Sequence, residues 1–220
     1  METQRPHSRW AVFHAGFFLL IVAAVAVGLP AMVWPLYLLI PVGLYAASLA
    51  VWPAWRRSAP RLAVGRLTGP PVAAAVALGV LTSAVLVAFH WLVRPEVTQL
   101  AAKLPMSLHH NLVVAALCFS TLNALLEEFV YRGVLYEALA AEWGAVVAIG
   151  GTAAAFGLGH LAGYPRGIMG AILAGLYGIA LGLLRWWTGG LGLVVACHIA
   201  ADATIFGLMA WEGAFRGAED

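Results

Sequence analysis

Apolar runs of about 20 residues follow one another along almost the whole chain, and this pattern limits the fold more than any other feature. A helix needs roughly 20 apolar residues to cross the hydrocarbon core of a bilayer. Charged residues make up only 10% of the 220 positions, whereas a soluble domain carries about 25%. Because so few charges cannot cover a water-soluble surface, we predict an all-α, polytopic transmembrane helix bundle.

The apolar runs predict about seven spans, with six or eight as alternatives because proline-broken segments can be re-entrant. The expected spans are residues 11–29, 31–51, 71–93, 111–139, 143–161, 166–187 and 189–211. We expect a turn near Ala141, and an interfacial helix or a loop over residues 94–110. Residues 1–110 thus form an N-terminal part of about three spans, residues 111–210 a second helical part, and residues 211–220 a tail.

Basic residues concentrate in cytoplasmic loops of membrane proteins. With a cytoplasmic N-terminus, that side would hold Arg5, Arg9, Arg56, Arg57, Arg61, Arg66, Arg132 and Arg185. The other side would hold Arg94, Lys103, Arg166 and Arg216. The count is eight against four, or seven against four if Arg132 lies inside the bundle. We therefore expect an integral membrane protein with a cytoplasmic N-terminus. The richness in alanine, glycine and arginine, with a single lysine, favours the inner membrane of a GC-rich bacterium.

Several residue types carry little functional signal. A net charge of +2 leaves no basic surface for phosphates, so no nucleic-acid partner is expected. Cys118 and Cys197 lie in apolar runs without zinc-like spacing, and we interpret both as small buried hydrophobic residues. The histidines without a nearby carboxylate in the sequence are interpreted as interfacial: His14, His90, His109 and His110. Small residues at every fourth position of residues 166–187 predict close helix packing: Gly170, Ala174, Gly178 and Gly182.

Six ionisable residues fall in or near the apolar spans, where a charge costs about 2.5–3.5 kcal/mol on insertion scales. They are Glu127, Glu128, Arg132, His160, His198 and Asp202. Such residues usually face a bundle interior and serve a function. They form three short patterns on three different spans, and helices of one bundle can bring them to a single interior point.

The first pattern is EEFVYR at residues 127–132. Glu128 and Arg132 are four residues apart, so they share a helix face and we expect them to pair. Asn123, Glu127 and Tyr131 form a neighbouring polar stripe. An arginine that holds one carboxylate ionised leaves the other carboxylate to move protons, which suits a general acid and base. The alternative is an ion pair that only fixes helix packing.

The other two patterns are FGLGH at residues 156–160 and HIAAD at residues 198–202. His198 and Asp202 share a face, so the carboxylate can orient the imidazole or both can contact one ligand. His160 lies near the end of its span, where a lone histidine is more often a packing residue. A self-satisfied polar pair is the corresponding alternative for His198 and Asp202.

These three motifs, in this order and on separate apolar segments, resemble those of the CPBP family of CAAX proteases and bacteriocin-processing proteins, also called Abi. The family pattern is EExxxR, FxxxH, and HxxxN or HxxxD. The resemblance covers roughly residues 111–210 and implies an intramembrane endopeptidase of the CAAX prenyl endopeptidase type. Residues 111–210 would then be the catalytic bundle, working on a peptide or a prenylated or otherwise lipidated protein within the lipid bilayer.

The resemblance implies a role for each motif residue. Glu127 would be the general base and His160 would orient the attacking water, while Glu128 and Arg132 would support Glu127. His198 and the residue at 202 would stabilise the oxyanion. Many relatives with CAAX activity carry asparagine at that last position. An ionised Asp202 cannot donate a hydrogen bond, so it would instead have to be protonated, orient His198 or bind a metal.

The sequence leaves the metal dependence and the class of function open. We expect no cofactor and no metal, but a zinc-dependent alternative would use Glu127, His160 and His198 as ligands. The protease is the preferred function. A non-catalytic membrane scaffold or bacteriocin-immunity-type protein of the same fold would use the polar core for binding alone. A small proton-coupled transporter is the third hypothesis, and the lack of a visible inverted repeat counts against it.

Overall fold

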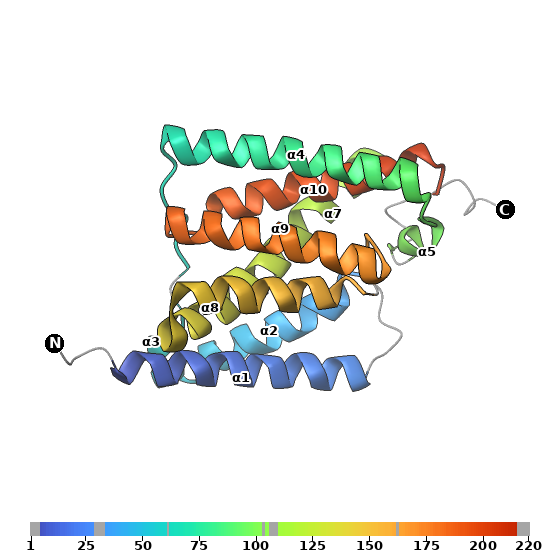
Figure 1. Cartoon of the computed structure of the whole chain (residues 1–220). Coiled ribbons are helices and arrows are strands. Elements are labelled where there is room, and N and C mark those ends of the chain that lie inside the picture. The colour runs from blue at the N-terminus through green and yellow to red at the C-terminus, as the bar shows by residue number, and fades with distance from the viewer. Residues whose placement is uncertain are drawn as a thin grey trace.

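The computed structural model describes residues 5–28, 34–60, 62–102, 104–105, 110–161 and 163–214, and within them the chain is all-α, as predicted (Figure 1). Its elements in chain order are α1 (Arg5–Gly28), α2 (Leu36–Val51), α3 (Pro53–Ser58), α4 (Gly69–Val93), α5 (Thr98–Ala101), α7 (Leu112–Glu128), the π-helix η1 (Phe129–Leu135), α8 (Tyr136–Gly159), α9 (Gly167–Thr188) and α10 (Gly192–Trp211). Arg61, Lys103, His109 and Arg216, used in the sequence analysis, lie outside the described residues.

Four helical segments of the described chain are long and apolar enough to cross a membrane: α4, the continuous segment Leu112–Gly159, α9 and α10. Two shorter apolar helices, Trp10–Ala24 and Leu36–Val51, accompany them. Large apolar side chains such as Leu92, Val146 and Ile168 are mostly exposed on the outside of the bundle. Such a surface is unfavourable in water and suits a hydrocarbon surrounding. The structure therefore supports an integral membrane protein, while the count of seven spans stays a prediction.

The reversal expected near Ala141 lies at Gly144 instead. This residue has φ 83° and ψ 172°, a conformation that glycine adopts without steric penalty, in the middle of an otherwise helical segment. Leu139 and Gly151, which lie on either side of Gly144 in the sequence, are close in space, since a Cβ atom on Gly151 would lie 2.8 Å from Cδ1 of Leu139. The chain therefore folds back at Gly144. The motif at residues 127–132 and the motif at residues 156–160 consequently lie on the two arms of one hairpin.

Helix α10 occupies the interior, where it packs against α4 on one side and α7 on the other, and α8 packs along α9 (Figure 1). Helix α1 covers α8 and α2. The segment expected to be an interfacial helix or a loop contains α5, and Val97, Ala101 and Leu104 from this region are buried in a core cluster with Phe119. These described residues of the segment thus contribute to the packed interior.

The arginine-rich segment is tied to the α9–α10 turn. Backbone N–H groups of Arg66, Leu191 and Gly192 donate to carbonyl oxygens of Thr188, Ala63 and Val64 at 2.8–2.9 Å. These bonds place Arg66 and the end of α9 at the same end of the bundle. Arg132, in contrast, is fully buried, so the charge count becomes seven against four. The cytoplasmic N-terminus stays a prediction.

The stripe of small residues on α9 is buried, as expected. A Cβ atom on Gly178 would lie 2.9 Å from Cα of Ala153 on α8, and one on Gly182 would lie 3.1 Å from Cγ2 of Ile149. On the α8 side, a Cβ atom on Gly157 would lie 2.6 Å from the carbonyl oxygen of Ala171. The two helices therefore approach as closely as their backbones allow.

We predict that Gly157→Ala destabilises the protein, because the added methyl group meets a backbone oxygen that cannot move aside. The loss should be about 1–3 kcal/mol, as for other overpacked interiors. Gly150→Ala on the same helix is the matched control, since a Cβ atom there meets nothing within 4 Å. Thermal unfolding in detergent micelles measures both variants. Equal melting temperatures for the two would contradict the close contact between α8 and α9.

Candidate active site

The two neighbouring glutamates lie where α7 passes into the π-helix. Asn111 begins α7 as its N-cap and accepts a hydrogen bond from the N–H of Val114 at 3.1 Å. Helix α7 ends at Glu128, and η1 follows over Phe129–Leu135. Single π-turns inside α-helices are frequently found at functional sites. Here the π-helix begins inside the EExxxR motif, and the side chains of Glu128 and Arg132 on either side of its start are buried in the bundle.

Glu128 and Arg132 form a fully buried ion pair, which confirms the pairing predicted from their spacing. Nη1 of Arg132 donates to Oε1 of Glu128 at 2.7 Å, and both side chains have 0% exposure. Nη2 of Arg132 donates to the carbonyl oxygen of Gly178 on α9 at 3.2 Å. The guanidinium carbon also lies 4.7 Å from the ring centre of Phe156. One side chain thus joins η1, α8 and α9.

His198 on α10 contacts carboxylates through both ring nitrogens. Its Nδ1 lies 2.6 Å from Oε1 of Glu128, and its Nε2 lies 3.6 Å from Oε2 of Glu127 and 3.8 Å from Oδ1 of Asp202. A carboxylate accepts hydrogen bonds, so this arrangement favours a ring that carries a proton on each nitrogen. The first and third motifs therefore meet at His198.

Asp202 has a partner that the sequence analysis did not predict. Its Oδ2 accepts a hydrogen bond from Nδ2 of Asn123 on α7 at 3.2 Å, and Oδ1 of Asn123 accepts one from Nε1 of Trp34 at 3.1 Å. All three side chains are buried. The four-residue spacing of Asn123 and Glu127 is the one feature of the sequence that points to Asn123 as a site residue. Nothing in the local sequence pointed to Trp34.

His160 immediately follows α8 and faces the same region. Its Nδ1 donates to the carbonyl oxygen of Phe156 at 2.9 Å, which leaves Nε2 as the acceptor nitrogen. The ring of Phe156 lies between the two histidines, with centroids 4.5 Å from His160 and 5.7 Å from His198. Glu127 and His198 lie within electrostatic range of His160. The second motif thus joins the other two.

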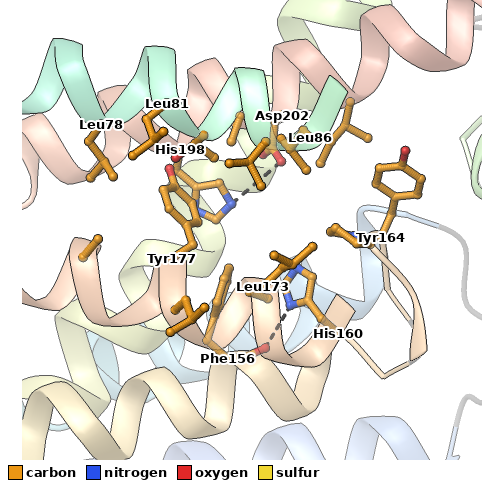
Figure 2. Close-up of a pocket in the computed structure, with 18 residues that line it drawn as sticks. Leu78, Leu81, Leu86, Phe156, His160, Tyr164, Leu173, Tyr177, His198 and Asp202 are labelled. Atoms are coloured by element: carbon orange, nitrogen blue, oxygen red, sulfur yellow. Dashed lines mark hydrogen bonds and ion pairs between the residues drawn. The ribbon is translucent and has the colours of Figure 1, made fainter. Parts of the chain in front are cut away.

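A cavity of about 250 Å³ lies beside these residues, between α4, α9, α10 and the end of α8 (Figure 2). His160, His198 and Asp202 contribute to its wall, which is otherwise mainly apolar. Figure 2 shows His198 and Asp202 on one side of the cavity and His160 with Phe156 on the other. Glu127 is not part of this wall and meets the site through His198.

Three interpretations of single residues were wrong. His14 is buried and bonded through its two nitrogens to Tyr45 at 2.8 Å and Ser58 at 3.0 Å. His90 is buried between Tyr164 at 3.2 Å and Glu212 at 2.9 Å. Neither histidine is interfacial, because each finds its partners on helices or loops far away in the sequence. Cys118 is exposed on α7, and Cys197 is buried as expected.

The zinc-dependent alternative needs Glu127, His160 and His198 to converge on one ion. Within the described part of the chain, no group of three His, Cys, Asp or Glu side chains is arranged to hold a metal ion. This includes the set Glu127, His160 and His198. The two nitrogens of His198 instead contact separate carboxylates. The residues present do not fit a three-ligand metal centre.

Comparison with known families agrees with the motifs. Residues 109–204 match the family model described as type II CAAX prenyl endopeptidase Rce1-like. The match covers the segment in which the resemblance was found from the motifs. The Rce1-like segment contains all three motifs, whereas α1 to α5 lie outside it. No curated protein and no solved structure matches the chain. The match to this family model suggests a protease of the CAAX type.

We predict that Arg132→Ala destabilises the Rce1-like bundle strongly. The substitution leaves Glu128 buried without its cation, and breaking a buried ion pair from one side costs about 3–5 kcal/mol. Arg57→Ala, on the short helix α3, is the control because its side chain is exposed. Melting temperatures and the yield of monodisperse protein in detergent measure both variants. Wild-type values for Arg132→Ala would show that the pair does not support the fold.

Proposed function

We propose that the protein is an intramembrane endopeptidase that hydrolyses a peptide bond of a membrane-associated or lipidated substrate. The observation that supports this proposal most directly is the position of His198 at the wall of a mainly apolar cavity. Its ring lies between the buried Glu128 on one side and Glu127 and Asp202 on the other. The family match supports the same reaction class. Embedding in about seven spans of a bacterial inner membrane, with a cytoplasmic N-terminus, is part of this proposal.

The number of acids in the site argues against a purely structural role. An ion pair that only fixes packing needs one acid and one base, and Glu128 with Arg132 supplies both. Glu127 and Asp202 are additional carboxylates in a setting where each buried charge is unfavourable. Helix packing gives no reason for them, whereas proton transfer does.

In the proposed reaction, Glu127 takes a proton from a water molecule that His160 orients through the lone pair on Nε2. The water oxygen forms a bond to the carbonyl carbon, and the carbonyl π electrons move onto the oxygen. When the tetrahedral intermediate collapses, the carbon–nitrogen bond breaks and the amine takes the proton from Glu127. Glu128 and Arg132 hold His198 and the helix junction in place.

Stabilisation of the oxyanion is assigned to His198, whose ring lies at the cavity wall and is positively charged when both nitrogens carry a proton. Donors aimed at the developing charge are commonly the largest single contribution to such catalysis. Asp202 already accepts a hydrogen bond from Asn123, which suits a carboxylate. We therefore assign Asp202 to the orientation of His198, one of the roles left open by the sequence, rather than to donation.

The cavity wall favours an apolar substrate group. Most of its surface is apolar and includes leucine, valine and phenylalanine side chains from α4, α8 and α9. The prenyl chain of a CAAX-type protein or an apolar peptide segment has the matching chemistry. The hydroxyl of Tyr177 also lies at this wall, buried and without a hydrogen-bond partner among the described residues. A peptide group would satisfy it.

Two other functions give different outcomes in the experiments below. A membrane scaffold or immunity-type protein would bind a partner through the polar core without cleaving it. A transporter would move protons or a solute across a vesicle membrane. Purified protein in liposomes, supplied with a prenylated CAAX peptide or with a pH gradient, separates the three.

We predict that Glu127→Gln lowers peptide cleavage by at least about 10²-fold, the usual contribution of a general base. Folding should be preserved, because Glu127 does not belong to the Glu128–Arg132 pair. Glu142→Gln is the control, since Glu142 is in α8 near the turn at Gly144 and far from the site in the hairpin. Cleavage of a fluorogenic prenylated peptide in detergent gives the rates. Full activity in Glu127→Gln would remove this residue from the reaction.

We also predict that Thr82→Trp raises KM for an apolar substrate several-fold with a smaller effect on kcat. Thr82 lies in the cavity wall, and a large ring there fills part of its 250 Å³. Val80→Trp is the matched control on the same helix, because Val80 is exposed and does not line the cavity. Initial rates over a range of peptide concentrations measure the effect. Identical KM values for the two variants would place the substrate elsewhere.

A further inference from the structure

A residue of the N-terminal half of the chain, outside the family match, connects to the site. Trp34 has only 4% exposure, and its ring packs against Phe119 with centroids 5.3 Å apart. Its Nε1 contacts Oδ1 of Asn123 at 3.1 Å, and Nδ2 of Asn123 contacts Oδ2 of Asp202 at 3.2 Å. The three side chains form a buried relay that ends at the cavity wall.

The chemistry of the indole fixes the direction of this relay. An indole N–H donates and never accepts, so it must face the oxygen of the Asn123 carboxamide. The amino group of Asn123 then necessarily turns toward Asp202. Without the indole N–H, the carboxamide could turn over and present its oxygen to the carboxylate. The bond from Asn123 occupies Oδ2 of Asp202 and leaves Oδ1 facing Nε2 of His198 at 3.8 Å.

We propose that Trp34 is a positioning residue of the active site, acting through Asn123 to hold Asp202 in the orientation that faces His198. The expected effect on catalysis rests on the proposed protease function, whereas the effect on Asp202 does not. The ring and the N–H of Trp34 have separable tasks. The ring fills space in a buried cluster with Phe119 and Leu86, and the N–H sets the relay.

Trp34→Phe separates the two tasks, because it keeps an aromatic ring and removes the donor. The readout is the side-chain carboxyl carbon of aspartate, labelled with ¹³C. The sequence contains two aspartates, Asp202 and Asp220, so the spectrum has two signals and Asp202→Asn assigns them. We expect Trp34→Phe and Asn123→Ala each to shift the Asp202 signal by more than its line width and to leave the Asp220 signal in place.

Trp91→Phe is the control, since Trp91 is a half-exposed tryptophan of α4 whose ring lies near Arg94. It should leave both aspartate signals and the activity unchanged. An Asp202 signal that coincides in Trp34→Phe and the wild type would overturn the proposal. This measurement needs no substrate, so it decides the relay even if the wild-type protein cleaves no peptide and the proposed function fails.

Where cleavage is measurable, the two variants should behave as one unit. Trp34→Phe and Asn123→Ala should each lower kcat roughly tenfold, at the lower end of what loss of an orienting partner does, with little change in KM. The double variant should be no slower than Asn123→Ala alone, because the indole acts only through the carboxamide. A double variant with the product of the two single losses would show that Trp34 acts by another route.

Discussion

The buried ion pair between Glu128 and Arg132 is the interaction on which the rest of the structure depends. Burying two charges costs free energy that further hydrogen bonds offset, although Oε2 of Glu128 and Nε of Arg132 have no hydrogen-bond partner among the described residues. Arg132 reaches the carbonyl oxygen of Gly178, and Glu128 reaches His198. Glycine suits this position, since a Cβ atom there would lie 2.9 Å from Cα of Ala153 and 3.3 Å from Nη2 of Arg132. Close packing of α8 on α9 and assembly of the site are therefore one constraint.

His198 connects this ion pair to the other two carboxylates of the candidate site. It shares Glu128 with Arg132 through one nitrogen, and its other nitrogen faces Glu127 and Asp202. Interactions between charges are stronger in a low-dielectric interior than in water. The apolar cavity wall next to His198 keeps the dielectric low on the side where a substrate would bind. Glu127, which does not take part in the Glu128–Arg132 pair, is the proposed proton acceptor.

The sequence predicted what depends on spacing within one helix and missed what depends on contacts between distant segments. Helical periodicity placed Glu128 with Arg132 and His198 with Asp202, and both pairs are found. The reversal lies at Gly144, three residues beyond the expected Ala141, and it is marked by the positive φ of this glycine, which spacing within a helix does not predict. His14 and His90 were misjudged for a related reason: their partners are 31 to 122 residues away.

The three motifs lie in residues 109–204, whereas part of the cavity wall comes from a helix that precedes this segment. Residues 109–204 hold every proposed catalytic group, yet the cavity is closed on one side by α4, which lies outside this match. Helix α4 packs mainly on α10 and has little contact with α9, so the cavity lies between a helix of the matched segment and one beyond it. Substitutions on α4 can therefore change which substrate group fits the cavity while the proposed reacting residues stay the same. The contacts of Trp34 with Asn123 and of Asn123 with Asp202 connect the N-terminal part in turn to the proposed catalytic residues.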